Sequence, residues 1–172
     1  IYNYMNDDAI SSILIIAVLL LFSAYFSATE TAFSSLNRTR LRAMAEKGNS
    51  KAALALSLAE KYDQLLSSIL VGNNVVNIAM SSISTLLFVR LMPDIGATVS
   101  TIVITIVVLI FGEISPKSLA KENPEKFAMV SAPIIRVVIW VLTPINFLFT
   151  QWKKLLGRIF KGGDAHRMTQ DE

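Results

Sequence analysis

Long apolar runs dominate the pattern of hydrophobic and polar positions along this chain. Two runs, Ala9 to Thr29 and Leu65 to Val89, contain no charged residue over 21 and 25 positions, and Ile95 to Gly112 adds a third of 18 positions. A helix needs about 20 mostly apolar residues to cross the hydrocarbon of a bilayer. The pattern therefore predicts an all-α membrane protein with three transmembrane helices, over about 9–28, 63–89 and 96–115.

A fourth apolar region has a different character. Val137 to Trp152 covers only 16 positions, basic residues flank it on both sides, and Pro133 and Pro144 fall in or near it. Proline removes a backbone donor and kinks or breaks a helix. We therefore expect 124–160 to form a kinked juxtamembrane helix, which lies at the interface or enters the cytoplasmic side and returns. A full fourth span is the alternative.

The charged residues predict the orientation of the spans. Acidic residues (Asp7, Asp8 and Asp94) and a single base, Arg90, flank one end. The other end carries the basic residues Arg38, Arg40, Arg42, Lys47, Lys51, Lys61, Lys117, Lys121, Lys126, Lys153, Lys154, Arg158 and Lys161. Basic loops stay in the cytoplasm, so we expect a multi-pass plasma-membrane protein with its N-terminus outside and its C-terminus inside. Anionic lipid headgroups, and not nucleic acid, are the expected partners of bases placed beside spans.

The basic segment between the first two spans has the pattern of a short cytoplasmic helix pair. Leu41 to Leu58 is interrupted by Gly48-Asn49-Ser50, a turn signal in which Ser50 is expected to cap the second helix. We expect one membrane domain over 1–160. The polar residues 161–172 then form a tail or the start of a linker.

Composition narrows the possible chemistry. Hydrophobic residues make up 53% of the 172 positions and charged residues 17%, against roughly 25% charged in soluble domains. The chain has no cysteine and one histidine, His166, which lies in the polar tail. Because no conventional pair of nucleophile and base can be drawn from these residues, we do not expect an enzyme, and a thiolate metal site is excluded.

Two asparagines in the second span are candidates for ion binding. Asn73 and Asn77 are four residues apart, so they share one face of a helix, and Gly72 allows close approach of another backbone or a ligand. Polar groups within a bilayer are costly and need partners. The alternative is that the pair joins helices through hydrogen bonds.

A carboxylate at the inner end of the third span favours the cation interpretation. Glu113 follows Gly112, and Pro116 has no N–H to pair with the Gly112 carbonyl four residues earlier. A carboxylate beside a carbonyl suits a hard cation such as magnesium, which takes oxygen ligands. The alternative is that Glu113 forms an ion pair with Lys117.

The first span ends in a group of hydroxyl residues around Glu30. Ser27 and Thr31 share one helix face, while Glu30 shares a face with Ser34 and Ser23. Hydroxyls in helices commonly bond back to their own backbone. Glu30 is either an acid of a cation pathway or half of an ion pair with Arg38 or Lys117, and the sequence leaves both open.

Three motifs resemble those of one known family. They are FSATETA at 26–32, GNNVVN at 72–77 and GEISPK at 112–117. Together they resemble the transmembrane module of the CorC/cyclin M (CNNM) magnesium transporters, also described as hemolysin-like. The resemblance covers about residues 9–160, and three motifs in the same order make it specific. Ala28 departs from the glycine that is usual in the first motif.

The resemblance implies a fold and a function. It implies a homodimer that binds a dehydrated Mg²⁺ ion between its helices and exports it, coupled to sodium (Na⁺) entry. The implied ligands are the side chains of Ser27, Asn73, Asn77 and Glu113 and the carbonyl of Gly112. The family's ATP-binding regulatory domain, a cystathionine-β-synthase pair, is expected in the full-length protein and is not part of this chain. The alternative function is a membrane anchor and dimerisation module for such a domain.

Overall fold

The computed structural model describes residues 2–161, with the side chains of residues 8–157 except 146 and 149. The residues 162–172, which include His166 and nearly all of the predicted tail, lie outside the described part. Described residues form α1 (Tyr2–Ser35), α2 (Arg38–Glu46), α3 (Ser50–Glu60), α4 (Tyr62–Leu91), α5 (Gly96–Val107), the π-helical segment η1 (Val108–Ile114), α6 (Ser115–Glu122) and α7 (Pro124–Lys161). The prediction of an all-α membrane protein is confirmed.

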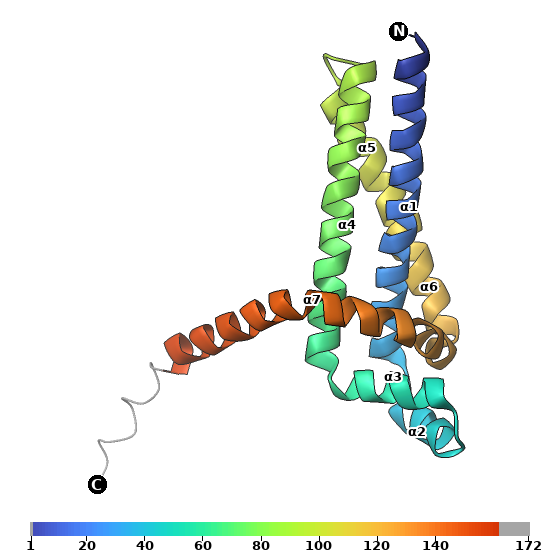
Figure 1. Cartoon of the computed structure of the whole chain (residues 1–172), viewed down its shortest axis with the longest axis vertical. Helices are drawn as coiled ribbons and strands as arrows, with labels where there is room; N and C mark the ends of the chain where they lie inside the picture. The colour runs from blue at the N-terminus through green and yellow to red at the C-terminus, as the bar shows by residue number, and fades with distance from the viewer. Residues whose placement is uncertain (1, 162–172) are drawn as a thin grey trace.

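Three long helical rods form the body of the molecule. α1, α4 and the continuous rod α5–η1–α6 run side by side along the long axis (Figure 1). Four helical stretches in the described residues are long and apolar enough to cross a membrane, namely 8–35, 62–91, 96–122 and 124–145. The protein is therefore a multi-pass membrane protein. The fourth of these stretches is the first part of α7. Length and apolarity alone therefore allow four spans, and the predicted number of three is not confirmed.

The course of α7 differs from that of the other long helices. It crosses the bundle near the end at which α2 and α3 lie, and its second half extends away from the bundle (Figure 1). Pro133 and Pro144 both lie inside this one helix, which continues through them. Tyr25 Oη of α1 donates a hydrogen bond of 3.0 Å to the carbonyl of Ser131 and so ties the first half of α7 to the bundle.

The predicted helix pair between the first two rods is present as α2 and α3, but its capping residue differs from the prediction. Asn49, not Ser50, caps α3, because its side chain accepts hydrogen bonds from the amides of Lys51 and Ala52. Gly48 has φ of 90°, a left-handed conformation that favours glycine. This turn places Asn49 in the cap position and Ser50 in the first turn of α3.

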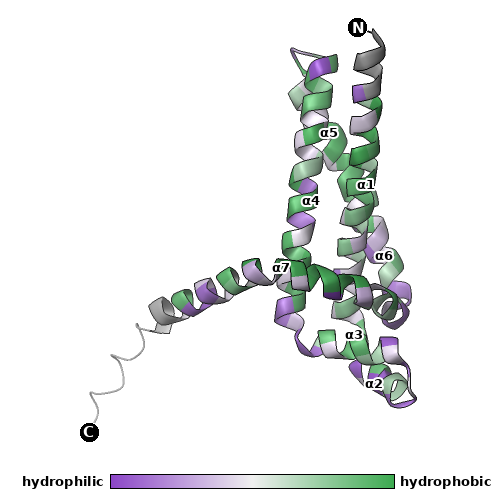
Figure 2. Ribbon diagram, viewed as in Figure 1, coloured by the Kyte–Doolittle hydropathy of each residue, from purple (hydrophilic) through white to green (hydrophobic). Residues whose placement is uncertain are grey.

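The buried core lies at the end of the molecule where α1, α3, α4 and α7 meet. It contains small residues, including Ala32, Ala55 and Ala132, and larger ones such as Phe26 and Leu65. Small side chains let helix backbones approach closely. Toward the other end, large apolar side chains such as Leu21 and Ile102 are exposed, as expected of a surface that faces lipid; Figure 2 shows this apolar stretch along α1 and α5.

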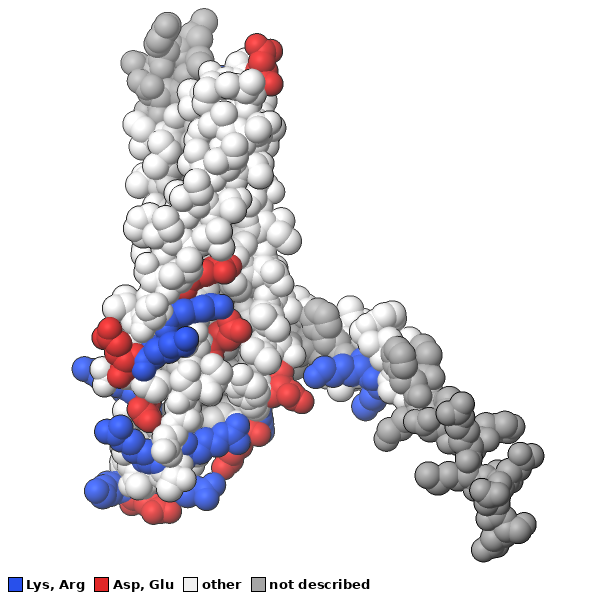
Figure 3. Space-filling model, turned by 180° about the vertical axis from the view of Figure 1, so that it is seen from behind, with Lys and Arg blue, Asp and Glu red and all other residues white. Residues whose placement is uncertain are grey.

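The charged side chains gather at the end that holds the core. Figure 3 shows a long uncharged surface and a dense cluster of both signs over α2, α3 and α6. Several of these charges are paired, since Arg40 approaches Glu125 at 3.9 Å and Arg42 approaches Glu60 at 3.9 Å. The uncharged length matches a membrane-embedded body with most of its charge at one end, while the other end carries a few charged residues, including the ion pair of Arg90 and Asp8.

Candidate metal site between the membrane helices

α1 and α4 approach each other closely at Gly72. A Cβ atom built on Gly72 would lie 2.6 Å from Cζ of Phe26, closer than real side chains allow. Glycine at this position therefore lets the Phe26 ring pack directly against the α4 backbone. The close approach brings the polar side chains that follow Gly72 on α4 up to α1.

Ser23 of α1 is the point at which the polar groups meet. It is completely buried, and its hydroxyl oxygen lies 3.2 Å from Oδ1 of Asn73 and 2.8 Å from Oδ1 of Asn77. A hydroxyl has one proton, so it can donate fully to only one of the two amide oxygens. With the two amides oriented in this way, three oxygens converge with a single proton among them. A cation is the kind of ligand that such a cluster attracts.

Gly112 borders the same spot from the third rod. A Cβ atom on Gly112 would lie 3.0 Å from the Ser23 hydroxyl oxygen, so η1 also packs against Ser23. The Ser115 amide donates to the carbonyl of Ile110, five residues back, in the π-helical pattern. Pro116 follows and has no N–H, and the Gly112 carbonyl therefore cannot have residue 116 as its α-helical partner. The sequence predicted a proline break here, and the structure shows a π-helical segment just before the proline, a feature frequent at functional sites.

Ser27 lies one helical turn beyond Ser23 on α1. It is completely buried, and its hydroxyl is without a hydrogen-bond partner among the described residues. Two neighbouring hydroxyls bond back to α1 carbonyls, Thr29 at 2.7 Å and Ser34 at 3.0 Å. A buried hydroxyl without a partner costs about 1–3 kcal/mol. Ser27 therefore offers an oxygen that a bound ion would satisfy.

Glu113 follows Gly112 in η1 and is half-buried. It makes no ion pair or hydrogen bond with any described residue, and the alternative pairing with Lys117 is wrong, because Lys117 Nζ lies 3.4 Å from Oε2 of Glu30 instead. The same contact makes Glu30 half of an ion pair with Lys117, one of the two alternatives for this residue. Within the described residues no three His, Cys, Asp or Glu side chains gather at one place. A cation at this site would therefore rely on neutral oxygens and one carboxylate.

Of the predicted site residues, the structure brings Asn73, Asn77 and Gly112 together around one point. Ser27 lies a turn away on α1, and Glu113 is adjacent to Gly112 in the chain. The residue at the centre, Ser23, was missing from the predicted ligands. Its spacing of four residues from Ser27 was the signal available in the sequence, because it places both hydroxyls on one helix face.

Comparison with known proteins places the chain in a family. The model of the cyclin M transmembrane N-terminal domain matches residues 14–172. The chain belongs to the cyclin M transmembrane-domain family. A UPF0053 protein of Haemophilus influenzae is 40% identical over 156 residues, covering 90% of this chain and 37% of the relative. The UPF0053 inner membrane protein YfjD of Escherichia coli is 41% identical over 137 residues, covering 80% of this chain and 32% of its own length.

The relatives of this cyclin M domain extend beyond bacteria and are much longer than the chain. A chloroplastic DUF21 domain-containing protein of Arabidopsis thaliana is 33% identical over 166 residues, covering 92% of this chain and 24% of the relative. The chain thus spans only about a quarter to two fifths of the length of these curated relatives. The resemblance found in the three motifs is confirmed at the level of the family.

The three motifs of the cyclin M domain lie on three different rods. Residues 26–32 are in α1, 72–77 in α4, and 112–117 run from η1 into α6. The contacts of Phe26 with Gly72, and of Ser23 with Asn73, Asn77 and Gly112, bring them to one region of the bundle. Three segments that are far apart in the sequence therefore lie next to one another at the candidate site.

Proposed function

We propose that this cyclin M domain binds a dehydrated Mg²⁺ ion between α1, α4 and η1 and carries it across the membrane. The observation that supports this most strongly is the convergence of the Asn73 and Asn77 amide oxygens on the buried hydroxyl of Ser23. In a bilayer such a cluster of acceptors is costly unless a donor or cation joins it. Gly112 borders the same point, since a Cβ atom at this position would lie 3.0 Å from the Ser23 hydroxyl oxygen.

The available oxygens match the chemical demand of magnesium. Mg²⁺ prefers about six oxygen ligands in octahedral geometry. The proposed ligands are the side chains of Ser27, Asn73, Asn77 and Glu113 and the carbonyl of Gly112, and Ser23 is a further neighbouring hydroxyl. A single carboxylate leaves the ion partly uncompensated, which suits a cargo that must also be released. Alternation between states open to either side would move the ion, with export in exchange for Na⁺ as the proposed direction.

The proposed topology has three spans. α1, α4 and α5–η1–α6 cross the membrane with the N-terminus outside, and the charged end of the bundle faces the cytoplasm. The crossing direction of α7 and the exposed Arg136 within its apolar part support an interfacial position. We place the domain in the plasma membrane as a homodimer, joined in the full-length protein to an ATP-binding regulatory domain.

One observation favours a second function, a membrane anchor and dimerisation module. The Ser23 hydrogen bonds already join α1 to α4 without any ion. In that case Asn73 and Asn77 contribute to stability alone, and the activity belongs to another part of the longer protein.

Magnesium flux in proteoliposomes separates the two functions. The purified chain is reconstituted with an entrapped magnesium-sensitive dye, beside an Asn73→Ala variant that keeps its helical circular dichroism and its elution volume. Flux through the wild type that is abolished in the variant supports transport. Absence of flux through the wild-type chain, with Asn73→Ala merely less stable, supports the anchor.

A further inference from the structure

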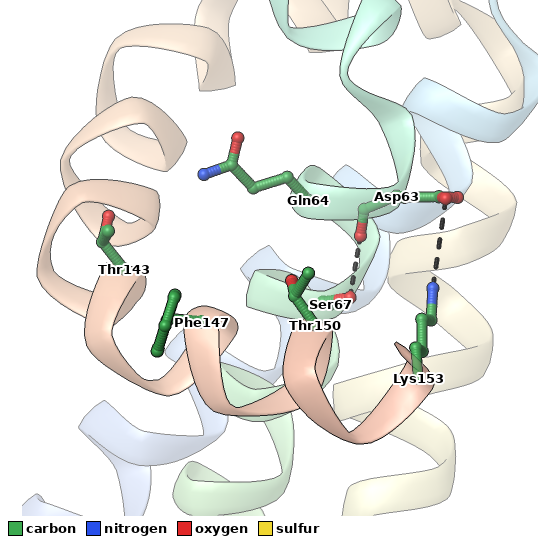
Figure 4. A pocket seen from close by; sticks show the side chains of 7 residues that line it. All are labelled: Asp63, Gln64, Ser67, Thr143, Phe147, Thr150 and Lys153. Atoms are coloured by element: carbon green, nitrogen blue, oxygen red, sulfur yellow. Dashed lines mark hydrogen bonds and ion pairs between the residues drawn. The ribbon is translucent and has the colours of Figure 1, made fainter. Parts of the chain in front are cut away.

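A groove separates the corner between α3 and α4 from the middle of α7. Its first part has a volume of about 430 Å³ and is lined by residues of all three helices, including Gln64 and Arg136, and by Lys61 between α3 and α4. A second part of about 460 Å³ continues along α7 and shares Gln64 and Thr143 with the first. Figure 4 shows this second part, with Gln64 extending into the space beside α7 and the ion pair of Asp63 and Lys153 (3.9 Å) at one side.

The first part of the groove carries positive charge without a counter-charge. Lys61 and Arg136 line it, and no Asp or Glu does. Neither of these two side chains makes an ion pair or hydrogen bond with a described residue, whereas the side chains of Arg40, Arg42 and Lys153 at the same end each pair with a carboxylate. Two unpaired cations in one groove favour an anionic ligand.

The first part of the groove also has apolar side chains in its walls. Leu54 and Leu58 contribute from α3, and Ile139 and Trp140 from α7. The Trp140 side chain is 78% exposed. Tryptophan concentrates at the level of lipid headgroups, and long basic side chains extend to the same level. The ligand therefore needs both an anionic group and an apolar part.

The position of the groove fits an amphiphile of the membrane. It opens where α4 begins, at the charged end of the uncharged bundle (Figure 3). Anionic headgroups of the cytoplasmic leaflet lie at such a boundary and attract basic residues there.

We infer that this groove binds the headgroup of an anionic phospholipid, with Lys61 and Arg136 at the phosphate. Gln64 and Thr143 add hydrogen-bonding groups, and an acyl chain lies along Ile139 and Trp140. A bound lipid joins α7 to the corner of α3 and α4. The inference is independent of the cation site, because it uses none of the residues around Ser23.

Fluorescence quenching of Trp140 tests the site. The chain has two tryptophans, so a Trp152→Phe variant leaves Trp140 as the only indole reporter. This variant is reconstituted in phosphatidylcholine bilayers that contain brominated phosphatidylglycerol or, at the same mole fraction, brominated phosphatidylcholine. Brominated phosphatidylglycerol is expected to quench Trp140 at a mole fraction several-fold lower than brominated phosphatidylcholine. Lys61→Gln with Arg136→Gln should remove this preference.

A matched control distinguishes a specific lipid site from non-specific attraction of anionic lipid by surface charge. Lys47→Gln with Lys51→Gln removes the same charge from the helix pair outside the groove, and the preference for phosphatidylglycerol should persist. Equal quenching by both lipids, or loss of the preference in the control, overturns the inference. If inorganic phosphate at a matched concentration displaces phosphatidylglycerol, the groove binds anions without requiring a lipid. This result would also overturn the inference. If the groove variant instead changes the oligomeric state in chemical crosslinking, the groove is an interface between copies and the lipid assignment is wrong.

Discussion

Buried hydroxyl groups join two helix pairs in this domain, and the two junctions differ in how well hydrogen-bond donors match acceptors. Between α4 and α5, the hydroxyls of Ser84 and Ser100 lie 2.8 Å apart, and Thr85 approaches Ser100 at 3.5 Å. Each hydroxyl both donates and accepts, so these groups satisfy one another. Between α1 and α4, the Ser23 hydroxyl meets two amide oxygens, and the Ser27 hydroxyl has no partner among the described residues.

The difference separates a structural contact from a candidate ligand site. A balanced pair such as Ser84 and Ser100 needs nothing further and holds its helices together. An excess of acceptors beside an unsatisfied hydroxyl gains from an added cation. Substitutions in the two junctions should therefore change different quantities: stability at the first, and magnesium affinity at the second.

The largest difference in magnesium affinity should separate Asn77→Ala, at the junction of α1 and α4, from Ser84→Ala, at the junction of α4 and α5. It removes an oxygen 2.8 Å from the Ser23 hydroxyl, and we expect magnesium affinity to fall roughly 10- to 100-fold, since a bond to a charged partner contributes about 1.5–3 kcal/mol. Ser84→Ala should leave the affinity unchanged and lower the free energy of unfolding by about 1 kcal/mol. Calorimetric titration and thermal unfolding in detergent measure both quantities. Equal affinity losses in the two variants would remove the distinction between the junctions.

Gly112→Ala should have the next largest effect. The added methyl group would lie 3.0 Å from the Ser23 hydroxyl oxygen, and crowding at this level in a packed interior costs about 1–3 kcal/mol. We expect roughly a tenfold loss of magnesium affinity. Gly157→Ala in α7 is the control, because nothing lies within 4 Å of its Cβ position, and it should bind as the wild type does. Unchanged affinity in Gly112→Ala would show that η1 does not border the ion.

Ser27→Ala should change stability by a smaller amount, and in a different direction with and without magnesium. Because the Ser27 hydroxyl is buried without a partner, its removal should leave the free energy of unfolding without magnesium unchanged or slightly raised. The stabilisation that magnesium adds should shrink, since stabilisation by a ligand follows its affinity. Thermal unfolding with and without magnesium measures both. A variant that is destabilised in metal-free buffer and stabilised by magnesium as strongly as the wild type would contradict a ligand role.

The sequence predicted the helical elements and several residues that the structure brings together, for identifiable reasons. Apolar runs longer than any soluble core helix requires marked α1, α4 and the third rod, and the spacing of Asn73 and Asn77 placed them on one face. The structure corrected details that depend on other parts of the chain. Asn49 caps α3 instead of Ser50 because Gly48 turns the backbone one residue earlier.

Ser23 was not predicted as part of the site for a related reason. Periodicity identifies residues that share a face of one helix, but not the neighbouring helix that this face meets. The contact depends on Gly72 and Gly112, whose lack of a side chain lets α4 and η1 approach α1. Similarly, Lys117 had two acidic residues within reach by sequence, and only the packing of α6 against α1 selects Glu30.

Magnesium binding to the detergent-purified chain, measured by calorimetry beside Glu113→Ala, tests the central claim most directly. Glu122→Ala in α6 is the matched control, since it removes an exposed carboxylate near the same end of the rod. All three proteins should retain the same helical circular dichroism and elution volume. The account predicts binding by the wild type and by Glu122→Ala, and loss of binding in Glu113→Ala. Equal binding by all three, or no binding by the wild type, would contradict a magnesium site at Glu113 and leave the anchor as the better explanation.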